Sequence, residues 1–359
     1  MSKAVAPRRR AEPVRQPRKL RTPSMPSFRL RPRTALAVWT CFVVAGVVCL
    51  AGAALNGPHA LAGAGAVLVV TAATWWLTAR CGGRPLLFST VAAVAGAIVA
   101  VVGNPQLSTG AAVTTAAITA VLAVMGTVPS VRFRGAVAEV LLAAGICLIG
   151  AGAALGFDPV IAIGRYQDTT LALAVVGCFV LVYRLGAGLH GLGRRGVVVV
   201  AIGGVLLVVT LLYAELLRTY GSSSIATAAN DATRWCHDHL GSYPRPVEAL
   251  LGVPALTWGT HLRARRRQGW WVCAFGVAFT APVTTTFANP GLPVIEALLT
   301  VVYSLVVGLV IGYVVIRIDL RVTSPRSRGG SRAAGRRAAR EAEVASAVRP
   351  EPSRSQPLL

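Results

Sequence analysis

The densest group of polar side chains lies in residues 218–246, between two long apolar runs. Four of its members could do chemistry, namely Asp231, His237, Asp238 and His239. Histidine and aspartate bind zinc, and histidine transfers protons near neutral pH, so a metal or catalytic site is one interpretation. On an α-helix, however, two histidines two residues apart are separated by roughly 200°. No HExxH pattern supports them. We therefore expect no metal, no cofactor and no catalytic residue here.

The same residues also fit a helix that lies flat in the membrane interface. Ser223 or Ser224 could cap such a helix, which would run through Leu240. Its apolar residues would share one side, with Trp235 at the depth of the lipid headgroups. We favour this interfacial helix over the metal or catalytic site.

Three carboxylates lie within or near apolar runs, namely Glu139, Glu215 and Glu296. A charge inside a bilayer is costly and is a functional candidate by default. Glu296 follows a break at Pro290 and Pro293, and is the first candidate for a substrate or ion pathway; Glu139 is the second. The alternatives are that Glu296 reaches the outer interface and that Glu139 forms an ion pair with nearby arginines at the inner one.

A GxGxxG pattern at Gly186–Gly191 matches the dinucleotide fingerprint. That fingerprint requires a strand before it, a helix after it and an acidic residue about twenty positions later. Here an apolar run precedes it, and residues 206–211 contain no acid. We interpret it as a loop, without a bound nucleotide.

Composition decides the class of the protein. Of the 359 residues, 54% are hydrophobic and only 14% are charged, against roughly 25% charged in soluble domains. The mean hydropathy is +0.63. The net charge of +23 would suit a nucleic-acid partner, but most of it lies in two tails and in short turns. These features exclude a soluble globular protein and predict an all-α, polytopic membrane protein.

About 20 apolar residues are needed to cross a hydrocarbon core of roughly 30 Å. Turn residues such as Asn56-Gly57-Pro58 and Asn289-Pro290-Gly291 separate the apolar runs. The predicted spans are Ala35–Leu55, Ala60–Ala79, Leu86–Gly103, Gly110–Val128, Ala136–Leu155, Thr169–Leu185, Val197–Leu217, Val247–Leu262, Trp270–Phe287 and Leu292–Ile316. The sequence thus predicts a bundle of about ten helices over residues 35–316.

The distribution of arginine and lysine predicts the orientation of these spans. With the N-terminus inside, 32 of the 36 basic residues fall on the inner side. The four outer ones are Arg165, Arg218, Arg234 and Arg245. We expect a multi-pass protein of the plasma membrane with both termini in the cytoplasm.

The two basic tails, residues 1–34 and 317–359, are expected to be disordered. Their arginines would attract anionic lipid headgroups or would only enforce topology. Besides the bilayer, other membrane proteins are the partners we expect, and nucleic acid is not one. The seven cysteines suggest no disulfide framework.

Three functions remain open. A transporter or permease for a small molecule or lipid is the first, because some exporters have ten spans with both termini inside. A non-catalytic membrane component of envelope assembly, or of a larger complex, is the second. An enzyme that uses the outer loop is the third and least favoured. The sequence assigns no substrate, and small-xxx-small pairs such as Gly152 and Gly156 indicate only close helix packing.

Overall fold

The structure is a computed structural model. It describes residues 32–185, 197–198, 200–209, 223–265, 269–323, 351–354 and 356–358. Regular structure in this part of the chain is helical throughout, and eight of its helices are long and apolar enough to cross a membrane. The protein is therefore an α-helical, multi-pass membrane protein.

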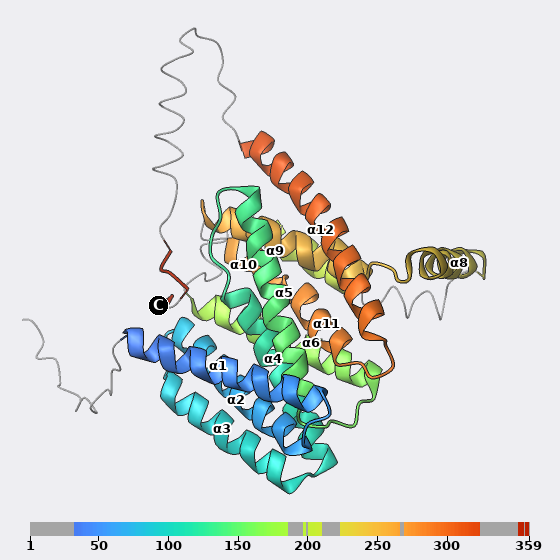
Figure 1. Ribbon diagram of the computed structural model, residues 1–359. Helices are drawn as coiled ribbons and strands as arrows, with labels where there is room; N and C mark the ends of the chain where they lie inside the picture. Colours follow the sequence, from blue (N-terminus) through green and yellow to red (C-terminus); the bar gives the residue numbers. More distant parts are fainter. Residues whose placement is uncertain are drawn as a thin grey trace, which may run out of the picture.

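The helices pack into a bundle (Figure 1). In chain order they are α1 (Pro32–Ala54), α2 (His59–Arg80), α3 (Pro85–Val102), α4 (Pro105–Met125), α5 (Phe133–Leu155), α6 (Ile163–Arg184), α8 (Ser223–Leu240), η2 (Val247–Gly252), α9 (Val253–Arg263), α10 (Gly269–Ala274), α11 (Val277–Phe287) and α12 (Val294–Thr323).

Local sequence explains where several helices begin. Proline stands at the first position of α3 and α4, where a missing N–H costs nothing. The side chain of Asn104 caps α4 by accepting hydrogen bonds from the N–H groups of Gln106 and Leu107. Gly103 ends α3 in the left-handed conformation, with φ of 62°.

Helices α1, α2 and α3 pack side by side at one edge of the bundle, and α11 lies among α4, α5 and α6 (Figure 1). The first and third helices of this edge expose most of their apolar residues, as lipid-facing helices do. By contrast, α10 and α11 are almost wholly buried. The centre of the protein therefore lies around α4, α9, α10 and α11.

The two ends of the bundle are named here by the residues that lie near them. At one end Arg80 Nε donates to the carbonyl of Met125, and the N–H of Ser130 donates to the carbonyl of Thr260. We call this the Arg263 end, because α9 finishes there. Loops between α1 and α2, and between α11 and α12, lie at the opposite end, which we call the Glu296 end.

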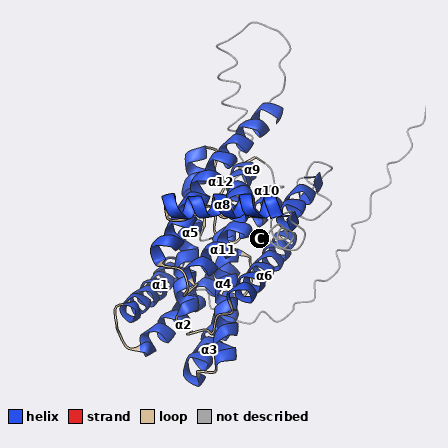
Figure 2. Ribbon diagram, turned by 90° about the vertical axis from the view of Figure 1, so that its right-hand side faces the viewer, coloured by secondary structure: helices blue, strands red, loops and turns tan. Residues whose placement is uncertain are grey.

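The helix expected over Ser223–Leu240 is present as α8 with those bounds. Figure 2 shows α8 running crosswise to the bundle, near the Glu296 end of α12. This direction agrees with a helix in the plane of the interface, and a hydrogen bond from Tyr303 Oη to the carbonyl of Leu240 fixes its last turn to α12.

Two of the ten expected spans differ from the simple picture of one long helix each. Within Val197–Leu217, only a short apolar helix at Val200–Val209 lies among the described residues, apart from residues 197–198. Val247–Leu262 divides into η2 and α9, which together are too short for the membrane-span criterion met by the other eight. Helices η2 and α9 are mostly buried inside the bundle, whereas most residues of Val200–Val209 are exposed.

The chain after the last span also differs from the expectation for residues 317–359. Helix α12 continues to Thr323, and residues 351–354 and 356–358 lie against the Arg263 end, where the N–H of Leu358 donates to the carbonyl of Arg80 at 2.8 Å. Most of the N-terminal tail and residues 324–350 lie outside the described residues.

Candidate functional site

Two interrupted helices cross at the centre of the bundle. The first changes from the π-helix η2 to α9 at Gly252 and Val253, beside Pro254, which has no N–H to donate. The second breaks between α10 and α11, where the N–H groups of Phe275 and Gly276 bond three residues back instead of four. π-turns are frequent at functional sites, and discontinuous membrane helices form the central sites of many transporters. The crossing is therefore the first place to look for function.

Glycines let these two segments approach closely. A Cβ atom on Gly252 would lie 2.3 Å from the backbone nitrogen of Phe279, and one on Gly259 would lie 2.6 Å from Sγ of Cys273. Neither distance can be accommodated without movement of the chain. Small residues thus give the tight backbone contact that helix association in lipid requires.

Gly308 and Gly312, a GxxxG pair in α12, allow a similarly close contact with α9. Cβ atoms on Gly308 and Gly312 would meet Val253 and Thr257 of α9 at 2.5 Å and 3.0 Å. The sequence predicts close packing at this pair, and the structure shows that α9 is the partner. The interrupted helix is therefore held from two sides.

A carboxylate is buried where the first interrupted helix begins. Glu248 has no exposed surface, and neither of its oxygens accepts a hydrogen bond of normal geometry from the described residues. The nearest cation is Arg245, with Nη1 4.0 Å from Oε1 of Glu248. The same Nη1 donates to Oγ1 of Thr286 in α11 at 2.6 Å. An ionisable group is thus placed at the junction of η2 and α11, where burial disfavours its charged form.

At the other end of α9, Arg263 is wholly buried and fully engaged. Its guanidinium donates to the hydroxyl of Thr127 at 2.8 Å and to the carbonyl of Thr127 at 3.0 Å. It also forms a two-point contact with Glu351, from Nη2 to Oε2 at 2.6 Å and from Nε to Oε1 at 3.4 Å. Its Cζ lies 3.5 Å above the ring of Trp270. These contacts match the geometry by which arginine binds carboxylates.

A second arginine, Arg80, is buried at the same end. Its Nη1 donates to three backbone carbonyls of the chain terminus, those of Pro352, Ser353 and Gln356, at 3.2 Å, 2.6 Å and 2.8 Å. Its Nη2 has no hydrogen-bond partner among the described residues. The C-terminal segment, residues 351–354 and 356–358, is therefore held by two buried guanidinium groups.

The pathway candidates Glu139 and Glu296 lie at opposite ends of the bundle. Glu139, in α5, is buried at the Arg263 end; it accepts a hydrogen bond from the N–H of Val128 at 2.9 Å and forms an ion pair with Arg354. The sequence suggested arginines of its own loop as the partners, and the structure gives one from the C-terminal segment instead. Glu296 lies in the first turn of α12, where it faces His237 of α8 at 3.7 Å.

The structure separates the members of the polar group around α8. Asp231 pairs with Arg234 at 4.0 Å, while the ring of His239 stacks on Trp235. The side chains of Asp231, His237, Asp238 and His239 are exposed. Among the described residues no three His, Cys, Asp or Glu side chains are placed to hold a metal ion. The expected GxGxxG loop, and Glu215, lie outside the described residues.

Sequence reasoning missed the burial of Arg80, Arg263 and Glu248. The two arginines lie at the ends of apolar runs, where arginine indicates only the topology of the chain. A signal for Arg263 was present, because it is the first arginine of a cluster and directly ends an apolar run, one position before the turn. Nothing in the local pattern indicates that Glu351 pairs with it.

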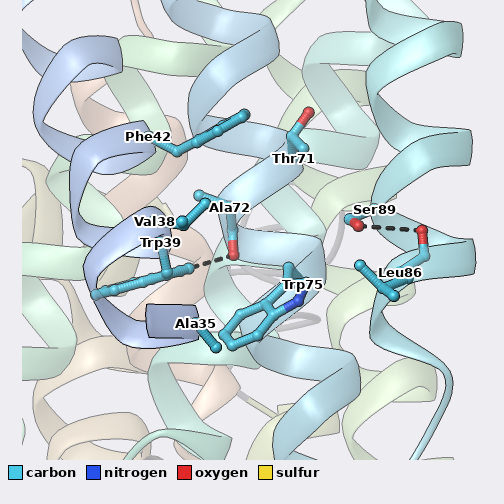
Figure 3. A pocket seen from close by; sticks show the side chains of 9 residues that line it. All are labelled: Ala35, Val38, Trp39, Phe42, Thr71, Ala72, Trp75, Leu86 and Ser89. Atoms are coloured by element: carbon cyan, nitrogen blue, oxygen red, sulfur yellow. Dashed lines mark hydrogen bonds between the residues drawn. The ribbon is translucent and has the colours of Figure 1, made fainter. Parts of the chain in front are cut away.

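Two hollows open near the Arg263 end, one between α1, α2 and α3 and the other between α1, α2 and the C-terminal segment. One, of about 160 Å³, is apolar and is lined by residues that include Trp39, Phe42 and Trp75 (Figure 3). The other, of about 240 Å³, is lined by Arg80 and Gln356 among others, and shares Trp39 and Trp75 with the first. A larger hollow of about 920 Å³ lies at the Glu296 end of α2, α3 and α4. None of these three is lined by Glu296.

The comparisons with known proteins give no relative. No protein-family model, no curated protein and no solved structure matches the chain. Function is therefore argued from the residues described above.

Proposed function

We propose that this multi-pass membrane protein is a permease-like transporter for a small molecule or lipid, and that its pathway follows the crossing of η2 and α9 with α10 and α11. The observation that carries the proposal is Glu248, a carboxylate with no exposed surface at the start of an interrupted helix. A purely structural bundle gains nothing from such a residue, since a buried charge with weak compensation is destabilising.

The two interrupted helices support this proposal by physical argument. Irregular backbone at membrane depth persists where it is buried in protein or lines a solute path, because lipid cannot satisfy free N–H and C=O groups. Breaks in two facing helices are the arrangement from which transporters build central sites. Glu139 and Glu296 remain pathway candidates as groups at the two ends of the bundle, on either side of Glu248.

The orientation and location follow from the basic residues. We propose that the Arg263 end faces the cytoplasm, that both termini lie there, and that the protein resides in the plasma membrane. The basic tails would then lie next to anionic headgroups of the inner leaflet. Other membrane proteins are further candidate partners.

Thermal unfolding of the purified protein provides the test. Small molecules that bind the folded state raise its Tm, so a compound that stabilises the natural chain and not Glu248→Gln is a candidate solute. That compound should enter proteoliposomes made with the natural chain faster than it enters protein-free or Glu248→Gln vesicles. Equal uptake in all three would refute the proposal. The alternative, a non-catalytic component of envelope assembly or of a larger complex, would then come first.

A further inference from the structure

The C-terminal segment, residues 351–354 and 356–358, contacts the bundle in the manner of a bound ligand. It brings one carboxylate, Glu351, to the guanidinium of Arg263. Arg80 binds backbone carbonyls of the segment rather than its side chains. The indole Nε1 of Trp76 donates to the carbonyl of Arg354 at 3.2 Å. Most of these contacts therefore recognise a carboxylate and carbonyl oxygens, which other molecules can supply.

Among the described residues, positive charges outnumber negative ones around the segment, with Arg80, Arg263 and Arg354 against Glu139 and Glu351. Arg80 and Arg263 are both buried, and the positive charge of each raises the free energy of burying the other. Glu139 is engaged by Arg354. Glu351 is therefore the carboxylate that pairs with Arg263, and its charge also acts on Arg80 without a direct contact. Nη2 of Arg80 still has no hydrogen-bond partner among the described residues. A buried donor without a partner, beside excess positive charge, points to an anion with more acceptor oxygens than one carboxylate offers.

An apolar hollow adjoins this charged site. The hollow lined by Arg80 and Gln356 shares Ala35, Trp39 and Trp75 with the apolar hollow between α1, α2 and α3 (Figure 3). The two hollows thus run side by side from an aromatic, lipid-facing cleft to a buried guanidinium. A molecule with an apolar chain and an anionic group fits that sequence of surfaces.

We propose that Arg80 and Arg263, the latter held in place by Thr127, form a binding site for a phosphate or carboxylate group, with the apolar hollow beside it for an attached chain. Residues 351–354 and 356–358 occupy this site as an internal ligand. An anion binds only by displacing Glu351 and the carbonyls that follow it. The C-terminal segment is therefore a competitor that the anion removes. This inference is independent of the proposed transport function.

The chain that joins α12 to the C-terminal segment sets how strongly the segment competes with a free anion for the site. A linked ligand acts at an effective concentration in the millimolar range when its linker can span the distance. Free phosphate should therefore displace the segment at millimolar concentrations or above. A lipid concentrated in the same membrane should act at a low mole fraction.

Displacement can be followed with a fluorophore on the segment itself. Gln356 is exposed and lines the same hollow as Trp76. We would attach bimane to Gln356→Cys in the full chain, with Cys41, Cys49, Cys81 and Cys236 changed to Ser. Tryptophan quenches bimane at contact distance, so emission is low while the segment is docked. Protein in phosphatidylcholine nanodiscs would be titrated with inorganic phosphate, and in a second arm phosphatidylglycerol would be added to the nanodiscs.

We expect emission to rise and saturate with the anion, and Glu351→Gln to show high emission with no anion present. The matched control is Glu343→Gln, which removes the same charge from the same tail and should behave as the natural chain does. Arg263→Lys keeps the charge but not the two-point fork, and should abolish the saturable response to phosphate. Because Glu351 belongs to the C-terminal segment and not to the bundle, its variant does not depend on refolding the core.

The two arms separate the sources of the anion. Release by free phosphate assigns the site to a soluble anion, and release by phosphatidylglycerol alone assigns it to a lipid headgroup. The proposal is overturned if sodium chloride of equal ionic strength releases the segment as well as phosphate does, because screening would then explain the effect. It is also overturned if neither anion changes the emission, or if Glu351→Gln stays as quenched as the natural chain.

Discussion

Arg263 and Glu351 are 88 residues apart in the chain and form a two-point ion pair with a shortest N–O distance of 2.6 Å. The arginine side chain is wholly buried, and that of the glutamate is 11% exposed. Since arginine stays protonated in any protein environment, its burial requires an anionic partner at the guanidinium. In this structure Glu351 of the C-terminal segment is that partner.

Removing the Glu351 carboxylate should destabilise the protein unless the charge of Arg263 is removed as well. We expect Glu351→Gln to lower the free energy of unfolding by about 2 kcal/mol, because Arg263 then remains charged and buried with Thr127 alone. The double variant Arg263→Met with Glu351→Gln should recover part of that loss. Thermal and denaturant unfolding in detergent, in a chloride buffer free of phosphate, would measure this cycle. Additive effects of the two changes would contradict a coupled pair.

The bundle itself was predictable because apolar length and turn residues act locally. The starts of α2, α3 and α4 follow from Pro58, Pro85 and Asn104, and the helix expected over Ser223–Leu240 is present as α8. These features depend on residues a few positions apart. Sequence reasoning handles such distances well.

The site could not be predicted for a different physical reason. The pairing of Arg263 with Glu351, and the contact of Gly259 with Cys273, join residues whose proximity is set by the whole packing. From the sequence, Arg263 indicates only the topology of the chain. Its burial and its ion pair with Glu351 arise because α9 ends inside the bundle. Likewise, Val247–Leu262 reads as one weak span, while the structure divides it at a π-turn.

The tight crossing of α9 and α10 gives a prediction about packing. Gly259→Ala would place a Cβ 2.7 Å from the backbone nitrogen of Cys273, so we expect it to destabilise the fold by about 1–3 kcal/mol. The matched control is Gly145→Ala in α5, where nothing lies within 4 Å of the new Cβ. It should be neutral or stabilising, by up to about 1 kcal/mol, since alanine favours helix. Thermal unfolding measures the stability of both variants. Equal stability of Gly259→Ala and Gly145→Ala would argue against the close packing of α9 and α10.

Orientation can be checked with a membrane-impermeant thiol reagent in intact cells. We expect Asp238→Cys, on the exposed face of α8, to be labelled from outside in a Cys236→Ser background. Ser327→Cys, in the C-terminal tail, should be labelled only after the membrane is opened. Ser242 is a poor probe because it is buried against Thr300, with the two hydroxyls 2.5 Å apart. Labelling of Ser327→Cys in intact cells would contradict a cytoplasmic C-terminus.

Cys81, in the turn after α2, offers a pH-dependent test of the packing at the Arg263 end. Burial raises the pKa of its thiol from about 9 to about 11, and the nearby charge of Arg80 opposes this only in part. Because the thiolate is the reactive form, alkylation at pH 8 should be about 100-fold slower in the folded protein than in denaturant. The rate should rise about tenfold per pH unit up to the pKa. An equal rate in the two states would place Cys81 in solvent.

The last prediction compares the two carboxylates at the Glu296 end. Glu296 is partly exposed and lies 3.7 Å from His237, so Glu296→Gln should change the stability by less than about 1 kcal/mol. Glu248 has no exposed surface, and Glu248→Gln should leave the stability unchanged or raise it, because a buried charge is removed without loss of shape. If the chain is a transporter, both variants should insert normally yet fail to restore a transport-linked phenotype in a strain that lacks the protein. Full restoration by Glu296→Gln would make Glu296 an interfacial residue only. Full restoration by both would remove the charge-based support for transport, because neither carboxylate would then be needed by the solute.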